Sequence, residues 1–398
     1  MTGRLLIACV LAVAAPAVEV VAGVVPAPQE RARTETLSPL DLTTAIDQLS
    51  AVDYPVRMNA ARRIRRVAAA QAVPALLQAV KDHKDGYVRY RALVLLTGFN
   101  DPRTADQVLV TMADANERLR EISYEYVEHH PDPKLVPVLL GALGREGAEF
   151  VRPALLRALA AHGSDPKVRA ALLPEIARGE TMFRSALIEA LGDYHAGYAV
   201  DALIETAQMD GPLQVDAAIA LGKIGDKRAL NALVAAQHAA PQEVQPQIAA
   251  GICLLGLNCP AHVGYIDKTL RFAAKNSGFQ PLLRSAAAAA EALGQSGNLD
   301  GVNLLFDVGV PSEDPVRAPV ALALGAVALR NTPLVLSALE KRGDRERAIL
   351  LLRDAFDMLE EPYEKERFFV AVRRAYWQAA EGSEPRKVAE ALIEKLEF

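Results

Sequence analysis

The stretch VDAAIALGKIGDKRALNALVAA, at residues 215–236, holds the pattern that decides the fold. Apolar residues recur at helical spacing from Val215 to Leu221, and a second apolar run begins at Ala229. Gly225 and Asp226 stand between the two runs, where a turn and the N-cap of a new helix are expected. No strand-like alternation competes with this pattern. The stretch therefore predicts two short helices joined by a turn.

The same phrase returns along most of the chain. Each copy opens with an apolar residue followed by Arg or Gln, and consecutive copies lie 30 to 33 residues apart, except for one step of 39. A fixed period of this kind is typical of a solenoid, and the long step predicts an insertion around residues 265–281. The copies open at Val56-Arg57, Val88-Arg89, Leu119-Arg120, Val151-Arg152, Phe183-Arg184, Leu213-Gln214, Val244-Gln245, Leu283-Arg284 and Val316-Arg317.

These marks resemble the HEAT family, in particular the short bacterial type that also occurs in bilin-lyase-like proteins. The resemblance covers roughly residues 53–340 and implies an all-α fold, namely a right-handed α-α superhelix, or HEAT/armadillo-like solenoid, of about nine helix pairs with terminal caps. It also implies that the second helix of each pair lines a concave binding face. The resemblance is carried by four stretches of sequence, namely Val151-Arg152 with Ala154-Leu155, Ala190-Leu191-Gly192, residues 220–226 and residues 136–140.

The two ends of the chain differ from the repeats. Residues 1–22 join a basic residue to a short apolar run and small residues, which predicts a cleaved signal peptide and a periplasmic or secreted protein. A flexible leader is expected at 23–38, a capping helix at 39–52, the repeats at 53–343 and a charged helical cap at 344–398. A lipoprotein attached at Cys9 and an uncleaved N-terminal anchor are alternatives that the short apolar run disfavours, and the mature chain is expected to hold no membrane span.

Composition excludes several classes of protein. With 51% hydrophobic residues the chain of 398 residues is too apolar for a disordered protein, and its net charge of −5 argues against a general nucleic-acid binder. Three cysteines cannot build a disulfide framework. Cys253 and Cys259 remain after signal removal, and in an exported protein they form either one disulfide or two separate buried thiols.

The recurring Arg has two interpretations. A row of arginines could bind an acidic partner along the array. A residue that recurs in every unit usually serves the unit itself, however, so we expect these arginines to pair with helix caps or with the adjacent turn. Exposed pairs of this kind would each contribute only about 0–1 kcal/mol.

The first copies are locally basic and give the candidate partner-binding site. Residues 53–93 contain nine basic and three acidic residues, a local sum of +6 in a chain of −5. Basic and aromatic residues together can receive an acidic peptide or a phosphate, and a solvated outer face is the alternative. The candidate binding residues are Arg62, Arg63, Arg65, Arg66, Tyr87, Arg89, Tyr90 and Arg91.

No pattern for catalysis, metal or cofactor binding stands out. Four histidines, His129, His130, His162 and His195, fall in turns, but the sequence has no Cys cluster and no His-Glu-x-x-His. It also lacks a Gly-rich phosphate loop and the His-Glu pairs of the family's di-iron hydroxylases. We therefore predict a protein without catalytic residues, metal or cofactor.

The sequence thus predicts an exported, non-catalytic HEAT-repeat scaffold that binds a protein or peptide, with acidic partners suited to the basic copies. The first alternative is a bilin-lyase-like, chromophore-handling protein. The second is a HEAT-fold nucleic-acid binder that uses the basic first repeats, and both export and net charge disfavour it.

Overall fold

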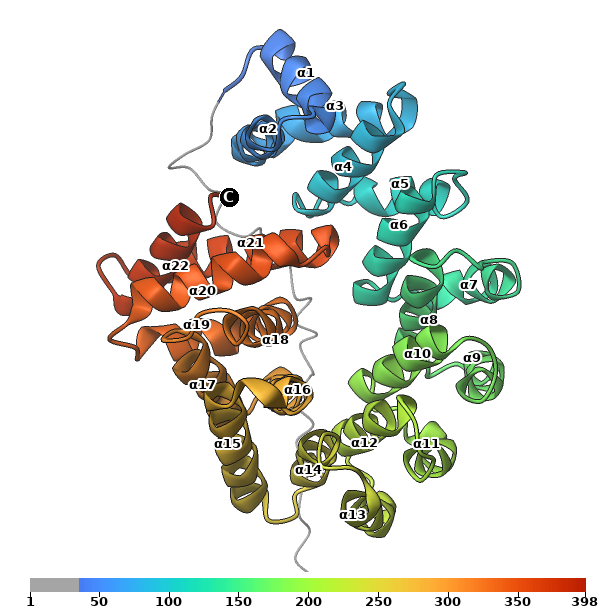
Figure 1. Ribbon diagram of the computed structural model, residues 1–398. Helices are drawn as coiled ribbons and strands as arrows, with labels where there is room; N and C mark the ends of the chain where they lie inside the picture. The colour runs from blue at the N-terminus through green and yellow to red at the C-terminus, as the bar shows by residue number, and fades with distance from the viewer. Residues whose placement is uncertain (1–35) are drawn as a thin grey trace, which may run out of the picture.

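The computed structural model describes residues 36–398, and their regular structure is entirely helical (Figure 1). Residues 1–35 lie outside this range, and with them the predicted signal peptide and most of the predicted leader. The helices alternate between two layers, as expected for an all-α solenoid. The first helices of the units are α2 Tyr54–Arg66, α4 Gly86–Thr97, α6 Glu117–His129, α8 Val151–Ala161, α10 Thr181–Asp193, α12 Leu213–Ile224, α14 Gln245–Leu254, α16 Gln280–Gln295, α18 Arg317–Arg330 and α20 Arg345–Met358.

The second helices flank this layer on its outer side. The long seventh step of the repeat is accounted for by α15, which has 17 residues, and by the short 3₁₀ turn that follows it. The second helices are α3 Ala69–Asp82, α5 Arg103–Thr111, α7 Val136–Leu143, α9 Pro166–Leu172, α11 Val200–Ala207, α13 Leu230–Ala239, α15 Cys259–Lys275, α17 Leu299–Gly309 and α19 Thr332–Glu340. Short 3₁₀ turns occupy Pro133–Leu135, Leu173–Ile176, Gly197–Ala199, Lys227–Ala229 and Ser277–Phe279.

Local capping explains where the helices begin and end. The Asp53 side chain accepts a hydrogen bond from the backbone N–H of Val56 at the start of α2, and Asp165 does the same for Lys167 at the start of α9. Gly225, at φ 80°, ends α12 in the left-handed conformation that glycine adopts at low cost. The turn chemistry in the sequence thus sets the helix boundaries.

Small residues bring neighbouring first helices close together. A side chain on Gly192 would meet the Ala220 backbone, and one on Gly222 would meet the Gly251 backbone, so only glycine fits at these crossings. Ala220 and Leu221 are fully buried there, as the repeat phrase predicts. The Ala-Leu-Gly phrase is therefore the contact surface between consecutive units.

The array closes on itself, which the periodicity did not predict. Helix α21, Pro362–Gln378, packs against α4 and α6, so the last helices lie beside the first units (Figure 1). The Tyr363 side chain is 1% exposed and belongs to the hydrophobic cluster of the N-terminal units. Instead of two free ends with polar faces, the described chain forms a ring.

Terminal helices stand on both sides of this closure. Helix α1, Pro39–Asp47, with the 3₁₀ turn Gln48–Ser50 lies within the segment where a capping helix was expected. Helices α20, α21 and α22, Glu384–Lys395, make up the charged C-terminal segment.

Among the described residues no single helix is long and apolar enough to cross a membrane. Helices α18 and α19 reach the required length and hydropathy only as a pair, and they meet at a bend of 115°.

Candidate functional site

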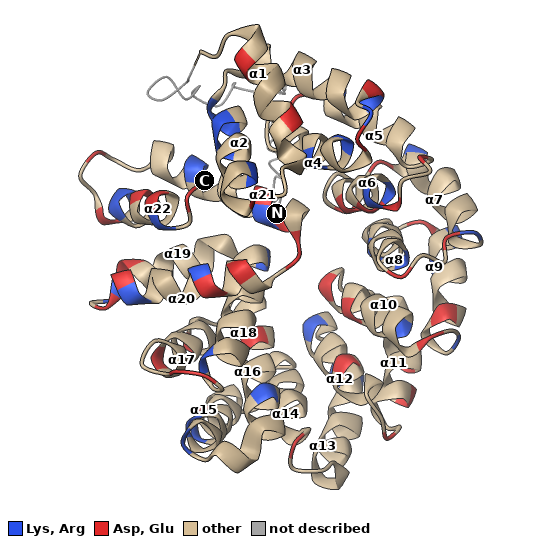
Figure 2. Cartoon of the chain, turned by 45° about the horizontal axis from the view of Figure 1, so that its top comes forward, with Lys and Arg blue, Asp and Glu red and all other residues tan. Residues whose placement is uncertain are grey.

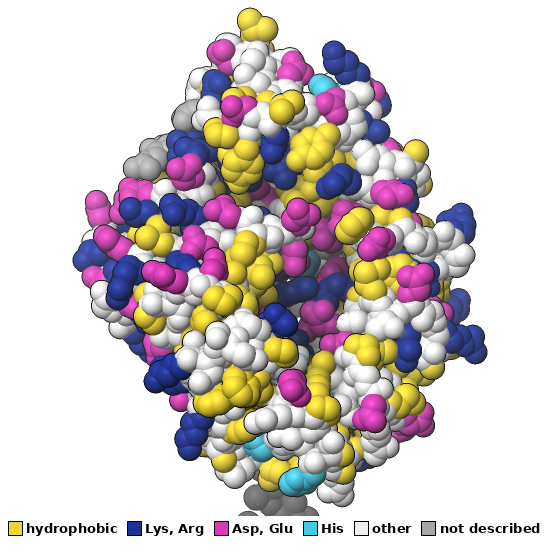
Figure 3. Space-filling model, viewed as in Figure 1, with side chains coloured by type: hydrophobic (Ala, Val, Ile, Leu, Met, Phe, Trp, Pro, Cys, Tyr) yellow, Lys and Arg dark blue, Asp and Glu magenta, His cyan; other side chains and the backbone are white. Residues whose placement is uncertain are grey.

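The last turns of the first helices converge on a cavity of about 560 Å³ inside the ring. Figure 2 shows charged residues on the ends of α10 and α12 that face this opening, and Figure 3 shows basic and acidic side chains gathered in the hollow. We call this space the central cavity. Its charged and polar lining residues include Glu128, His129, Arg157, Asp193, Tyr194, His195, Lys223, Gln295 and Arg330.

The layer that lines the interior is the opposite of the one expected. The resemblance implied that second helices would line the concave face, and this was wrong, because the lining comes from first helices such as α6, α8, α12 and α18. The physical reason lies in the spacing of the helices. The inner side of a closed curve is shorter than its outer side, and the first helices carry the small residues that permit close approach.

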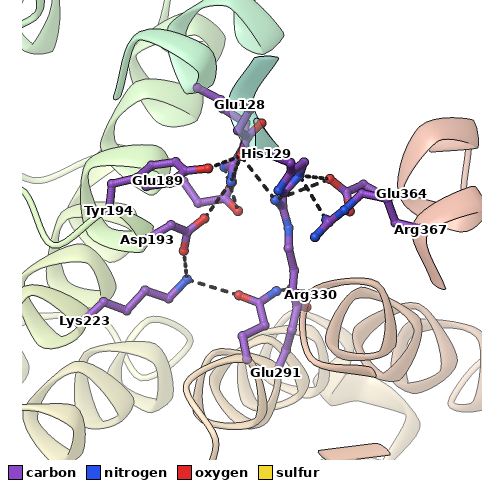
Figure 4. Close-up of polar contacts among 12 residues, drawn as sticks. Glu128, His129, Glu189, Asp193, Tyr194, Lys223, Glu291, Arg330, Glu364 and Arg367 are labelled. Carbon is purple, nitrogen blue, oxygen red and sulfur yellow. Dashed lines mark hydrogen bonds and ion pairs between the residues drawn. The ribbon is translucent and has the colours of Figure 1, made fainter. Parts of the chain in front are cut away.

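Arg157 lines the cavity and joins an ion network on its wall, and Figure 4 labels its partners Glu128 and Asp193. Its Nε donates to Glu128 Oε1 at 2.9 Å, and its Nη2 donates to Asp193 Oδ2 at 2.8 Å. The hydroxyl of Tyr194 donates to the same Glu128 oxygen at 3.0 Å. Helices α6, α8 and α10 are thereby joined through one guanidinium.

Lys223 extends the network across the cavity. Its Nζ donates to Asp193 Oδ1 at 2.7 Å and to Gln295 Oε1 at 3.1 Å. Gln295 in turn donates from Nε2 to Glu291 Oε1 at 2.9 Å. The chain of contacts therefore runs from α10 through α12 to α16, which are far apart along the sequence.

A second cluster lies where α21 closes the ring. Glu364 Oε1 lies 2.7 Å from His129 Nε2, and Glu364 Oε2 accepts from Arg367 Nη1 at 2.6 Å. Arg330 stands between the two clusters, with its Nη1 3.7 Å from Glu128 and 4.0 Å from Glu364. Among residues 36–398, no hydrogen-bond acceptor is found for the Arg330 guanidinium.

The network shifts the titration of its carboxyl groups in both directions. Burial raises the pKa of Asp193, but Lys223 and Arg157 outweigh it and hold that pKa at about 2. In Glu364 the effect of burial is likewise exceeded by His129 and the nearby arginines, and the pKa lies at about 2. Burial and the neighbouring Glu189 raise the pKa of Glu291 to about 8. The wall thus holds fixed, paired charges together with a carboxyl group that keeps its proton at neutral pH.

The cavity wall offers donors that lack hydrogen-bond acceptors, and an exposed carboxylate lies beside it. Among the described residues, the buried Nη1 of Arg157 has no hydrogen-bond acceptor and lies 3.6 Å from Glu189 Oε1, and Arg330 has only its two long ion pairs. The Glu189 side chain is 47% exposed and lines a neighbouring pocket together with Lys223 and Gln295. Such an arrangement suits recognition of carboxylates, amides and ammonium groups. Within residues 36–398, no group of three or more His, Cys, Asp or Glu residues is placed to hold a metal ion.

The structure does not place the eight predicted partner-binding residues on one exposed surface. Arg65 and Tyr90 are buried, and Arg89 donates to the Val80 carbonyl and to Asp114. Arg62 pairs with Glu397 across the ring closure. The remaining candidates, Arg63, Arg66, Tyr87 and Arg91, are partly or largely exposed.

Part of the excess positive charge in the first copies is thus neutralised by acidic residues of the same chain. The physical reason is that α21 and α22 bring acidic residues back to the first units. Arg65 pairs with Glu366 and Arg62 with Glu397, so the acidic partner of these two arginines is intramolecular.

In several copies the recurring Arg stabilises the repeat through hydrogen bonds to carbonyl groups that precede it and through an ion pair. Arg152 donates to the carbonyls of Leu143 and Glu146 at the end of the preceding helix and turn, and it pairs with Glu175, which follows the second helix of its own unit. Arg120 and Arg317 make the same kind of contact. Arg284 departs from the pattern, because its side chain is exposed.

The turn histidines have separate partners. His162 Nδ1 lies 2.7 Å from the Ala158 carbonyl, and His195 Nδ1 lies 2.6 Å from the Lys223 carbonyl. His130 stacks on Tyr126. Cys253 and Cys259 are joined by a disulfide, which resolves the two alternatives left open by the sequence.

Sequence reasoning missed the residues that form the central network. Arg157, Asp193, Lys223 and Arg330 were not singled out, because each lies in the first helix of its unit among mostly apolar residues. A usable signal was present, since Arg157 interrupts the run Ala154 to Ala161 with a full charge, and a buried charge requires a partner.

Solved structures with a similar helical arrangement are distant in sequence. YibA from Escherichia coli is 17% identical over 56% of this chain and 83% of its own, with a TM-score of 0.41. The phycocyanin lyase CpcE–CpcF complex from Nostoc sp. PCC7120 is 21% identical over 57% and 90%, with a TM-score of 0.36. Kap95p, solved with RanGDP, is 13% identical over 90% and 61%, with a TM-score of 0.43. Such similarities supply no argument about activity.

Two parts of the sequence match known families directly. Residues 42–128 match the family of HEAT repeats, and residues 213–238 match the PBS lyase HEAT-like repeat. No curated protein matches the chain. The HEAT-type repeats matched in these two stretches belong to one continuous array of helix pairs.

Proposed function

We propose that this HEAT-repeat protein is an exported, non-catalytic scaffold that binds a protein or peptide segment in its central cavity. The observation that carries the proposal is Arg330. Its guanidinium lines the cavity, lacks a hydrogen-bond acceptor among the described residues, and lies beside a network that holds the surrounding charges in place. A guanidinium with donors available in this way favours a carboxylate or a backbone carbonyl of a ligand.

The size of the cavity decides what kind of segment fits. A volume of about 560 Å³ lies within the range of about 300–1,000 Å³ that is usual for small-molecule pockets. A few residues of an extended peptide or a chain terminus fit such a space, whereas a folded domain does not. The partner is therefore expected to insert a short polar segment, with an acidic group near Arg330.

Export is a separate part of the proposal. It is supported by the signal-peptide pattern of residues 1–22 and by the bond between Cys253 and Cys259, because structural disulfides persist in oxidising compartments.

The test begins with affinity capture of partners from the envelope fraction and measures the dissociation constant of an identified partner. Arg330→Gln is expected to weaken binding about tenfold or more, because it removes a charge-assisted contact. Arg145→Gln is the matched control, since Arg145 is exposed in the loop between α7 and α8. Circular dichroism verifies that both variants are folded. Equal binding by Arg330→Gln and the wild type would place the binding surface elsewhere.

The match of residues 213–238 to the PBS lyase HEAT-like repeat favours one alternative, a chromophore-handling role. In that case the purified protein would change the absorption spectrum of an added bilin, and Arg330→Gln or Lys223→Gln would reduce the change. An unchanged spectrum would leave the scaffold proposal in place.

A further inference from the structure

A second cavity, of about 140 Å³, lies where α21 closes the ring against α2 and α4. Figure 3 shows dark blue basic side chains among yellow ones over α2 and α4. The cavity shares no lining residue with the central cavity. Its charged lining residues are Arg57, Arg65, Arg91 and Lys365, and none of the acidic residues between 36 and 398 lines it.

Three of these four cations already have acceptors. Arg57 donates to the carbonyls of Ala51 and Val52, and Lys365 donates to two carbonyls at the end of α20 and just beyond it. The Nε of Arg65 donates to Glu366 Oε2 at 2.8 Å. These three side chains are therefore held in place by the fold.

Arg91 is the exception. Among the described residues it has neither a hydrogen-bond acceptor nor an ion pair, and its guanidinium carbon lies 5.9 Å from the centre of the Tyr90 ring. Its side chain is partly exposed and lines the cavity. A guanidinium in such a position has donors available for a ligand.

The walls around Arg91 are aromatic and apolar. Tyr54 and Tyr87 line the cavity and are 53% and 38% exposed, and Phe369 lies on the α21 side. Tyr87 is fixed by an edge-to-face contact with the buried Tyr90. The lining thus combines cationic side chains with surfaces that favour an apolar group.

We propose that this cavity is a binding subsite for a carboxylate attached to an apolar group, with Arg91 as the principal donor. The same surface already pairs with two carboxylates of this chain, since Arg62 holds Glu397 and Arg65 holds Glu366. Arg91 pairs in the same way with the carboxylate of a bound ligand. The tyrosine rings contact the apolar part of the ligand, and the planar guanidinium matches the two carboxylate oxygens.

Ligand-observed fluorine NMR tests the subsite with 4-fluorobenzoate as the free acid. A fluorine-labelled, terminally blocked Leu-Glu-Leu peptide represents an acidic side chain of a partner. Binding of either probe supports the subsite, and the one that binds more tightly identifies the source of the carboxylate. The neutral 4-fluorobenzamide is expected to bind about tenfold more weakly or not at all, because it lacks the charge.

Arg91→Gln should weaken probe binding about tenfold or more, whereas Arg145→Gln should leave it unchanged. Because Arg91 has no polar partner among residues 36–398, the variant is expected to melt at the wild-type temperature, which shows that lost binding is not lost structure. Three results would overturn the proposal: no binding of either probe, equal binding by Arg91→Gln, or binding of 4-fluorophenyl phosphate alone. Because the two cavities are lined by different residues, Arg330→Gln should not affect these titrations.

Discussion

Replacement of Glu366 by Gln is expected to weaken the closure of the ring. The side chains of Arg65 and Glu366 are 4% and 1% exposed, and Arg65 Nη2 lies 2.7 Å from Glu366 Oε2. Removing one member of such a buried pair typically costs about 3–5 kcal/mol, because the other charge stays buried without compensation. Glutamine keeps the shape of the side chain and one acceptor oxygen. We therefore expect the free energy of unfolding to fall by about 3 kcal/mol, at the lower end of that range.

Two measurements together examine this prediction. Urea unfolding followed by circular dichroism gives the loss of stability, and small-angle X-ray scattering reports whether the ring opens, through an increase in the radius of gyration. Glu394→Gln on α22 is the control, since Glu394 is exposed. The double variant Arg65→Met with Glu366→Leu should recover most of the loss, because apolar residues of similar volume often replace a buried ion pair without cost. Surface substitutions usually change the free energy of unfolding by no more than about 0.5 kcal/mol. If Glu366→Gln changes it by no more than this and has the same radius of gyration as the wild type, the pair does not hold the ring closed.

Three further outcomes are expected. Leu221→Ala should cost roughly 2–5 kcal/mol in a denaturant melt, because Leu221 is fully buried between units, and a loss of a few tenths would contradict this packing. Glu291 has a folded pKa of about 8 against an ordinary value of 4.5, so the folded state binds the extra proton between these values and stability should fall as pH rises from about 4.5 to 8. Glu291→Gln should remove that part of the pH dependence, and an identical profile for variant and wild type would refute the assignment. N-terminal sequencing of the mature protein should find a start between Ala14 and Ala27, whereas an intact Met1 on a cytosolic protein would refute export.

The sequence alone predicted what depends on neighbouring residues. The period of the Val-Arg phrase, the turn at Gly225-Asp226 and the burial of Ala220 and Leu221 are local features, and the structure agrees with them. The structural role of the recurring Arg was also predictable. In the copies of Arg57, Arg89 and Arg152, the carbonyl groups that the arginine binds lie only five to nine residues before it in the sequence.

The tertiary structure decided which layer lies inside and what the charges do. Small differences in how each unit packs on the next accumulate around the array. The repeat period in the sequence does not indicate these differences. Their sum brings Glu366 and Glu397 back to Arg65 and Arg62, over more than 300 residues of sequence, and gathers Arg157, Asp193, Lys223 and Arg330 around one cavity. Contacts at that separation depend on the path of the whole chain, and no local pattern in the sequence specifies that path.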